Sequence, residues 1–210
     1  MIPEKLPEYP ELTFEDERHI YKLNGVIIPS VTTLMKPLSE AIYGGIDEEV
    51  LRVAAEKGTA VHNAIENFIQ FGIEDIDSKY EAYFQAFLKF WKDVRPRILK
   101  TESKVYHKIY RYAGTTDFVA DIGGKLTIID WKTSSRIEKV LTGVQLEGYA
   151  RAYESHGVDI EKKAIVLLKK NGEYTFDQDY PVRDTERLEI LGDLIAIRNY
   201  VNKYKGGTNK

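Results

Sequence analysis

Two acidic residues and a lysine lie close to a glycine pair in the segment TTDFVADIGGKLTIIDWKT. If Gly123-Gly124 forms the centre of a two- or four-residue turn, the flanking segments pair as a hairpin and Asp117 lies directly opposite Asp130. Directly opposed side chains have Cβ atoms about 4.5 to 5.5 Å apart, where two carboxylates repel each other. Lys132 lies on the same face of its strand as Asp130. A hairpin that needed only stability would not gather these charges.

These three charged side chains are compatible with three kinds of site. The first is a surface ion cluster, and the second is an acid/base pair in which one carboxylate keeps the other protonated. The third is a divalent-cation site, in which the carboxylates bind Mg²⁺ or Mn²⁺ while the lysine contacts the substrate or the attacking water. The hairpin by itself does not decide between them.

The spacing of apolar residues predicts the elements that surround this hairpin. Three- and four-residue spacing predicts helices, and runs of β-formers between turn residues predict strands. We expect helices over residues 47–71, 78–94, 138–155 and 184–204. We expect strands over residues 102–111, 115–122, 125–133, 162–170 and 173–180. Ser78 is the predicted N-cap of the second helix. This order of helices and strands predicts an α/β fold with a mixed sheet.

The length of 210 residues predicts a single domain over residues 1–210. Residues 1–18 are rich in proline and acids, which predicts an extended acidic arm. Residues 19–46 contain Asn24-Gly25 between β-forming residues, so we expect an N-terminal hairpin with a type I′ turn. The α/β core then occupies residues 47–204.

The composition excludes several kinds of protein. The chain has no cysteine, which excludes disulfides, zinc-thiolate sites, iron–sulfur clusters and cysteine nucleophiles. No apolar run reaches the roughly 18 residues that a membrane span requires, and the start MIPEKLPEYP lacks the pattern of a signal peptide. We therefore expect a cytoplasmic protein with no membrane contact. The formal net charge of -3 argues against binding of nucleic acid by bulk electrostatics alone.

The segment GTTDFVADIGGKLTIIDWKTSS, followed by QLEGY, resembles the PD-(D/E)xK nuclease superfamily. The resemblance is to its RecB-like branch, and within it to phage-type and mitochondrial genome maintenance-type exonucleases. Upstream, GTAVHNAIENF resembles the first-motif helix of that branch, and NGVIIPSVTTLM resembles its opening strand-turn segment, so the likeness extends over residues 19–155. The resemblance implies a restriction-endonuclease-like core, a central mixed sheet flanked by helices, and hydrolysis of DNA with one or two Mg²⁺ or Mn²⁺ ions.

The resemblance also implies a role for each matching residue. Asp117 and Asp130 match the metal-binding acids, and Lys132 matches the lysine that orients or activates the attacking water. The carbonyl of Trp131 falls where a backbone oxygen completes the metal shell. The metal-binding histidine, the upstream acid and the Gln-x-x-x-Tyr motif are matched by His62, Glu102, Gln145 and Tyr149. Thr116 replaces the proline of the superfamily's name, which this branch usually lacks.

The residues outside the hairpin also have plainer interpretations. His62 is either a metal ligand or a satisfied helix histidine, and Glu102 is either a ligand or the solvated start of a strand. Gln145 and Tyr149 are four residues apart on one predicted helix, so they either reach the site together or form a buried polar contact.

The groups that hold the substrate are less sharply marked. Eight basic residues against two acids between residues 89 and 111 can line a phosphate groove, although such a run is more often a solvated face. These bases are Lys89, Lys92, Arg95, Arg97, Lys100, Lys104, Lys108 and Arg111. The candidate groups for phosphate oxygens are Ser30, Thr32, Thr133, Ser134 and Arg136.

The leading hypothesis is a Mg²⁺- or Mn²⁺-dependent exodeoxyribonuclease that acts on DNA ends or single strands in replication, recombination or repair. An endonuclease is one alternative. Another is a catalytically inactive nucleic-acid-binding module on the same scaffold, which acts with a recombination or replication protein. A third is a structural α/β protein with a surface ion cluster.

Overall fold

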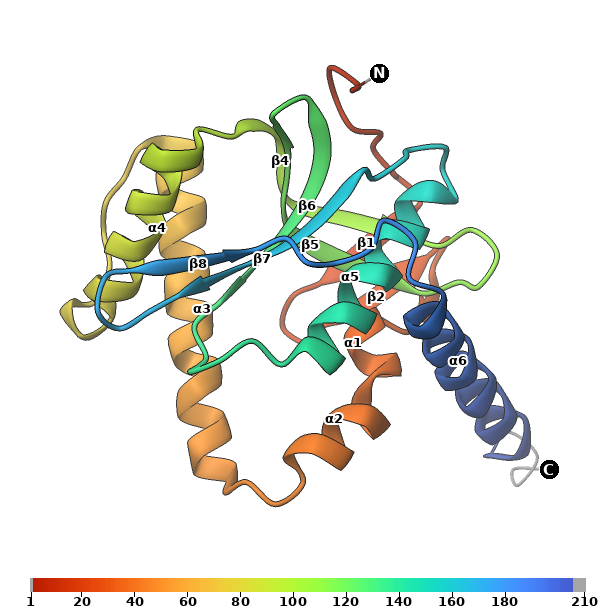
Figure 1. Ribbon diagram of the computed structural model, residues 1–210. Helices are drawn as coiled ribbons and strands as arrows, with labels where there is room; N and C mark the ends of the chain where they lie inside the picture. Colours follow the sequence, from red (N-terminus) through yellow and green to blue (C-terminus); the bar gives the residue numbers. More distant parts are fainter. Residues whose placement is uncertain (1, 206–210) are drawn as a thin grey trace.

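The central sheet has five strands in the order β4-β5-β6-β7-β8 (Figure 1). The computed structural model describes residues 2–205, within which these strands are β4 (Arg97–Tyr106), β5 (Ala113–Ile122), β6 (Lys125–Lys132), β7 (Lys162–Leu168) and β8 (Tyr174–Asp177). Neighbouring strands are antiparallel except β6 and β7, which are parallel. The connection between those two contains a helix, as a parallel pair requires. The predicted mixed α/β sheet is therefore confirmed.

The hairpin that carries the two acids has the predicted register. Gly123 and Gly124 form its turn, with φ angles of 61° and 80° that favour glycine. Phe118 lies opposite Ile129 in the antiparallel ladder of β5 and β6. Asp117 and Asp130 occupy the next position along the two strands.

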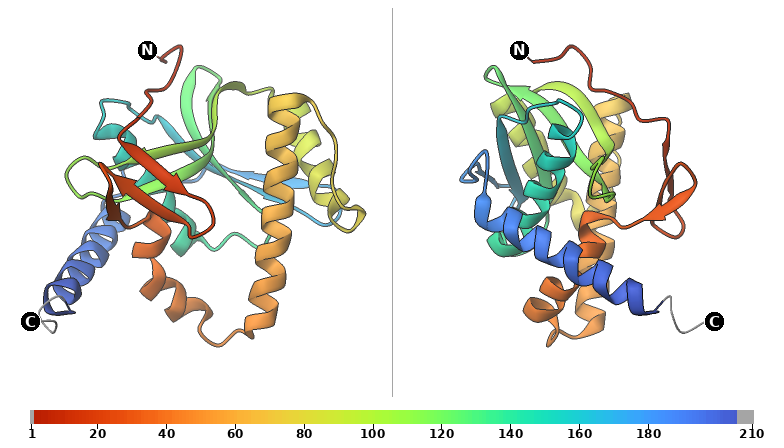
Figure 2. Two further views of the ribbon diagram at one scale, coloured as in Figure 1. Left: turned by 180° about the vertical axis from the view of Figure 1, so that it is seen from behind. Right: turned by 90° about the vertical axis from the view of Figure 1, so that its right-hand side faces the viewer.

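Of four long helices, three lie against the faces of this sheet, and the last packs on the third and extends away from the sheet (Figures 1 and 2). They are α3 (Glu48–Phe71), α4 (Glu81–Val94), α5 (Lys139–Glu154) and α6 (Thr185–Lys205), close to the predicted ranges. Gly58 does not interrupt α3, whose N-terminus is capped by the side chain of Asp47. The prediction for Ser78 is wrong, because Asp77 caps a 3₁₀ turn, η1 (Ser78–Tyr80), that precedes α4.

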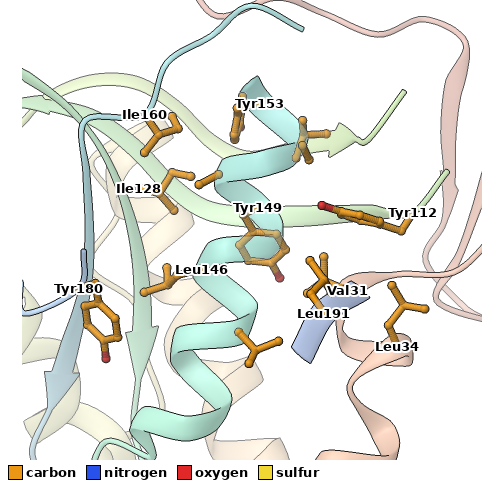
Figure 3. Close-up of a cluster of buried hydrophobic side chains, with 14 of the residues drawn as sticks. Val31, Leu34, Tyr112, Ile128, Leu146, Tyr149, Tyr153, Ile160, Tyr180 and Leu191 are labelled. Carbon is orange, nitrogen blue, oxygen red and sulfur yellow. The ribbon is translucent and has the colours of Figure 1, made fainter. Parts of the chain in front are cut away.

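Each face of the sheet has its own apolar core. The aromatic side chains of α4 pack against α3 and one face of β5 and β6, and Phe84, Phe87 and Phe90 are buried there. The opposite face packs against α5, α6 and the N-terminal helices. Figure 3 shows Tyr149 and Tyr153 of α5 within this second core. The two cores fix α3 and α5 on opposite sides of the strands that carry the acids.

A second sheet of three strands precedes these elements, in the order β1-β2-β3. Its strands are β1 (Leu12–Glu15), β2 (Ile20–Leu23) and β3 (Val26–Ile28). Asn24 and Gly25 join β2 to β3 with φ angles of 51° and 79°, which confirms the predicted hairpin and its turn type. Strand β1 lies inside the predicted arm of residues 1–18, so part of that arm is sheet.

Two elements differ further from the prediction. The short helices α1 (Val31–Leu34) and α2 (Lys36–Tyr43) follow β3 and were not predicted. They contain too few residues for a helical period, and α1 depends on Ser30, whose side chain accepts a hydrogen bond from the N–H of Thr33 at 2.9 Å. Strand β4 begins at Arg97, before its predicted range. The first half of this edge strand is exposed or half-buried, so its sequence lacks the apolar pattern that predicts a strand. Among residues 2–205, no helix is long and apolar enough to cross a membrane.

Candidate active site

The side chain of Asp117 links β5 to β6 at the end of the hairpin opposite the turn. Its Oδ2 accepts a hydrogen bond from the backbone N–H of Trp131 at 2.8 Å. The same oxygen lies 3.7 Å from Nδ1 of His62, whose Nε2 lies 3.2 Å from the carbonyl oxygen of Trp131. His62 is held there because its neighbours Val61 and Ile65 on α3 are buried against the sheet. One histidine therefore bridges an acid of β5 and the backbone of β6.

Glu102 completes a group of three possible ligands with His62 and Asp117, which we call the histidine group. One ligand atom from each residue lies within 4.8 Å of the other two. Glu102 lies on β4 with a φ angle of 43°, a left-handed conformation that is uncommon for a residue other than glycine. Backbone strain of this kind is concentrated at functional sites.

The electrostatics of the histidine group favour a cation. Burial and, after it, the charge of Asp117 raise the pKa of Glu102 to about 7. Burial and the charge of Asp130 outweigh the lowering effect of His62 and raise the pKa of Asp117 to about 6. Two acids that resist ionisation side by side gain from a proton or a divalent cation between them. Imidazole and carboxylate donors suit Mn²⁺, and the carboxylates also suit Mg²⁺. The residues present therefore fit a divalent cation.

A second set of side chains, which we call the lysine group, lies beside the first. Nζ of Lys132 is 2.7 Å from Oδ2 of Asp130 and donates to Oε1 of Gln145 at 3.2 Å. Nε2 of Gln145 donates to Oδ1 of Asp130 and to the hydroxyl of Tyr149, both at 3.1 Å. The four predicted residues thus form one continuous polar contact between β6 and α5.

In the lysine group, the ammonium of Lys132 is charged and the phenol of Tyr149 is neutral. Burial alone would lower the pKa of Lys132, but Asp130 and Asp117 outweigh it, so the pKa is raised and the ammonium keeps its charge. Burial raises the pKa of Tyr149 well above its ordinary value, and the charge of Asp130 adds to this effect. Tyr149 therefore remains a neutral phenol.

The two predicted metal-binding acids are neighbours but have different contacts. Asp117 belongs to the histidine group, whereas the carboxylate of Asp130 contacts Lys132 and Gln145. Among the described residues, Asp130 is not part of the cluster of three ligand atoms. The carbonyl of Trp131 is near the histidine group through its contact with His62.

A cleft of about 690 Å³, which we call the main cleft, opens onto the histidine group. Its lining comes from the N-terminal sheet, α1 and its cap, α3, the β4–β5 pair and α5. The lining residues are Phe14, Asp16, His19, Tyr21, Ser30, Thr32, Gly58, Thr59, His62, Asn63, Glu66, Glu102, Lys104, Gly114, Thr115, Asp117 and Tyr149. The predicted Ser30 and Thr32 are thus placed at the site, although Ser30 is buried and also caps α1.

The other predicted substrate groups are distributed differently. Thr133 and Ser134 line a smaller pocket together with His62 and Lys132, although the hydroxyl of Ser134 donates to the carbonyl of Arg136 at 2.6 Å. The side chain of Arg136 is 81% exposed and pairs with Glu138, so it is not brought to the main cleft.

The predicted phosphate groove along residues 89–111 is not formed as a unit. Lys89 pairs with Glu173, and Arg97 pairs with Asp121 on the neighbouring strand. Of the eight basic residues, only Lys104 lines the main cleft. The basic residues are spread over α4 and β4, and successive side chains of a strand point to opposite faces of the sheet.

Several residues that line the main cleft were not predicted from the sequence, among them three aromatic side chains and a glycine. Phe14, His19 and Tyr21 lie in segments interpreted as an arm and a hairpin, with no motif of their own. Gly114 was part of the GTTD motif, but its role was not predicted. A Cβ added to Gly114 would lie 3.0 Å from Cδ1 of the Tyr149 ring and closer still to Cε1, so only glycine allows this approach.

Known proteins resemble this chain in sequence. Over 128 residues it is 33% identical to the human (Homo sapiens) mitochondrial genome maintenance exonuclease 1. This alignment covers 55% of this chain and 37% of that protein. The mouse (Mus musculus) protein of the same name is 33% identical over 79 residues, 34% of this chain and 23% of that protein. The chain therefore spans about a third or less of the length of these relatives.

Solved structures and one family also match. An alkaline exonuclease (LHK-Exo) from Laribacter hongkongensis aligns with a TM-score of 0.36 and 14% identity, over 69% of this chain and 83% of that one. The same protein in complex with dAMP aligns with a TM-score of 0.32 and 15% identity, over the same shares. Residues 81–190, more than half of the chain, match the PD-(D/E)XK nuclease superfamily. They include β4, β5, β6 and α5, and the chain belongs to this superfamily.

Proposed function

We propose that this chain is an exodeoxyribonuclease that hydrolyses DNA phosphodiester bonds with Mg²⁺ or Mn²⁺. The observation that carries the proposal is the position of the histidine group beside the charged lysine group at the end of one hairpin. A divalent cation would neutralise charge on the phosphate. It would also lower the pKa of a bound water, so that a hydroxide nucleophile forms at neutral pH. The relatives that match over part of their length are named exonucleases, which supports the exonuclease mode.

In this proposal the histidine group holds the cation. His62 donates an imidazole nitrogen, and Glu102 and Asp117 donate carboxylate oxygens. Asp130 and the carbonyl of Trp131 are the remaining oxygen donors that we assign to the ion, because both adjoin the group. The negative charge of the acids also limits how closely a phosphate approaches without the cation.

The lysine group has a different task. The ammonium of Lys132 offsets charge on the phosphate, and Asp130 keeps that ammonium ionised. Gln145 accepts from Lys132 and donates to Tyr149, so helix α5 orients the lysine. Thr32 in the main cleft and Thr133 beside Lys132 are the hydroxyl groups that we assign to phosphate oxygens.

The test compares three fluorescent DNA substrates with each metal. We expect the protein to degrade a linear duplex or a single strand and to leave a closed circle intact. Lys132→Met should lower the rate by about 100-fold or more, because one positioned charge is removed from the transition state. Lys125→Met, on the same strand but exposed, is the matched control and should keep full activity.

Three outcomes would contradict the proposal. Rapid nicking of the closed circle would show that the protein cleaves internal bonds and is an endonuclease. Full activity of Lys132→Met would refute the role of the lysine group. DNA binding by the wild type, without cleavage in either metal, would favour an inactive nucleic-acid-binding module.

A further inference from the structure

The main cleft has an aromatic wall that comes from outside the family-matched region. Phe14, His19 and Tyr21 of the N-terminal sheet line the same cleft as the histidine group, whereas the family match begins at residue 81. Figure 2, left, shows this sheet in front of the central sheet, and β1 contacts β4. All three side chains lie outside the family match, and Phe14 also precedes the resembling segment that begins at residue 19.

The wall is attached to the strand that carries Asp117. Phe14 on β1 lies opposite Tyr21 on β2, with the two ring centroids 4.5 Å apart. The hydroxyl of Tyr21 is 2.7 Å from the hydroxyl of Thr115, two residues before Asp117 on β5. The ring of Phe14 is therefore fixed relative to the site.

Part of this wall faces solvent. Tyr21 is buried in the small core below the N-terminal sheet, but Phe14 is only half-buried. His19 is exposed, and its ring meets Phe14 edge-on at 5.0 Å between centroids. The two rings are nearly perpendicular, at 89°, so a nucleobase that stacks on one ring meets the other with its edge.

A positive charge accompanies the rings. Nζ of Lys104 lies 5.5 Å from the centroid of the Phe14 ring, and among residues 2–205 no carboxylate forms an ion pair with it. Asp16 also lines the main cleft near the wall, so a phosphate is disfavoured there and favoured at Lys104.

We propose that a nucleobase of single-stranded DNA stacks on the ring of Phe14 in the main cleft, with His19 at the edge of the base, while Lys104 contacts the adjoining phosphate. This inference rests on the proposed function, because it assigns part of the substrate to a subsite beside the cation. Stacking accepts every base, so the subsite would favour single strands over duplex without selecting a sequence.

The test measures binding and needs no cleavage. A fluorescein-labelled thymidine 10-mer and a fully abasic 10-mer are titrated with protein in EDTA, and anisotropy gives the two Kd values. The wild type should bind the thymidine strand more tightly. Phe14→Leu should weaken binding of the thymidine strand by about tenfold and leave the abasic strand unchanged, because only the stacked base is lost.

Two further variants complete the comparison. Lys104→Ala should weaken both strands equally and reduce the salt dependence of binding, since it removes a phosphate contact. Phe71→Leu makes the same change on a phenylalanine that is 68% exposed and does not line the main cleft, and it should alter neither Kd. If Phe14→Leu fails to fold, His19→Asn is the alternative, because asparagine tolerates the φ angle of 52° at that position.

The outcomes separate this inference from the proposed function. An equal effect of Phe14→Leu on both strands, or no effect on either, would overturn the stacking subsite even if the wild type cleaves DNA. A base-dependent effect in a wild type that cleaves nothing would overturn the nuclease proposal and support the subsite.

Discussion

The carboxylate of Asp117 accepts a hydrogen bond from the backbone N–H of Trp131, so an acid on β5 fixes the end of β6 between Asp130 and Lys132. One oxygen of Asp117 is thereby both a structural acceptor and a member of the histidine group. The two roles can be separated because asparagine keeps a carbonyl oxygen as an acceptor but carries no charge.

The first prediction concerns Asp117→Asn. Without metal at pH 7.5, we expect this variant to be at least as stable as the wild type, because a buried charge near Asp130 is removed. Mn²⁺ should raise the Tm of the wild type but not that of Asp117→Asn. Asp117→Ala should lose both the metal effect and stability, since the Trp131 N–H loses its acceptor.

The control for that measurement is Asp193→Asn on α6, an exposed residue outside the histidine group. Its Tm should rise with Mn²⁺ as in the wild type. An undiminished Mn²⁺ effect in Asp117→Asn would show that the ion binds elsewhere.

The second prediction concerns pH. Burial raises the folded-state pKa of Glu102 to about 7 and that of Asp117 to about 6, above their unfolded values. Between pH 4.5 and 7 the folded state therefore binds more protons than the unfolded state, and the free energy of unfolding falls as pH rises. The Tm of the metal-free protein should decrease over this range.

Mn²⁺ should oppose this decrease of the Tm with rising pH. Protons compete with the ion for the same carboxylates, so the Tm increase with Mn²⁺ should be larger at pH 7.5 than at pH 5.5. Glu102→Gln should flatten the metal-free pH profile. A metal effect of equal size at both pH values would exclude these carboxylates as ligands.

The hairpin could be predicted because its information is local. The turn at Gly123-Gly124 sets the register, and counting outward from it places Asp117 beside Asp130. The long helices were predicted from their apolar spacing for the same reason. The motif residues outside the hairpin came from the family resemblance, and the structure brings His62, Glu102, Gln145 and Tyr149 to the same end of it.

The remainder depends on contacts between distant segments. Nothing in the sequence around Phe14 indicates that it lines a cleft with Glu102, because that contact depends on how β1 packs beside β4. The sequence predicts a strand over residues 162–170, but it does not predict that Lys163 within it is 1% exposed and paired with a buried glutamate. A buried charge is recognised only with its partner.

The third prediction concerns Gly114. Gly114→Ala places a methyl group against the ring of Tyr149, so we expect a loss of about 1 to 3 kcal/mol in the free energy of unfolding. The loss should shrink in the Tyr149→Ala background, where the methyl group has space. The displaced ring should also lower nuclease activity, because Tyr149 accepts from Gln145.

Gly58→Ala is the comparison for this change. A Cβ there would meet only the hydroxyl of Thr133, at 3.9 Å, within the interior of α3. Urea denaturation should show a gain of about 0.5 to 1 kcal/mol, since alanine is the better helix former. Equal costs of Gly114→Ala with and without the Tyr149 ring would contradict the proposed contact.

The fourth prediction concerns the buried charges on the far side of α5. Glu147 is fully buried and pairs with Lys163 of β7 and with Arg151, whose Nε lies 3.0 Å from Oε1 of Glu147. Glu147→Gln leaves the Lys163 ammonium buried without a carboxylate, and we expect it to lower the free energy of unfolding by about 3 to 5 kcal/mol.

The double variant Glu147→Gln/Lys163→Met should recover part of that loss, because no charge then remains unpaired on β7. Lys162→Met, on the preceding residue and the opposite face of the strand, should change stability by about 0.5 kcal/mol or less. Urea denaturation of the wild type, Glu147→Gln, Lys163→Met and the double variant measures the coupling between the two sites. If the two single losses simply add in the double variant, Glu147 and Lys163 do not stabilise each other, and the orientation of α5 depends on its apolar contacts alone.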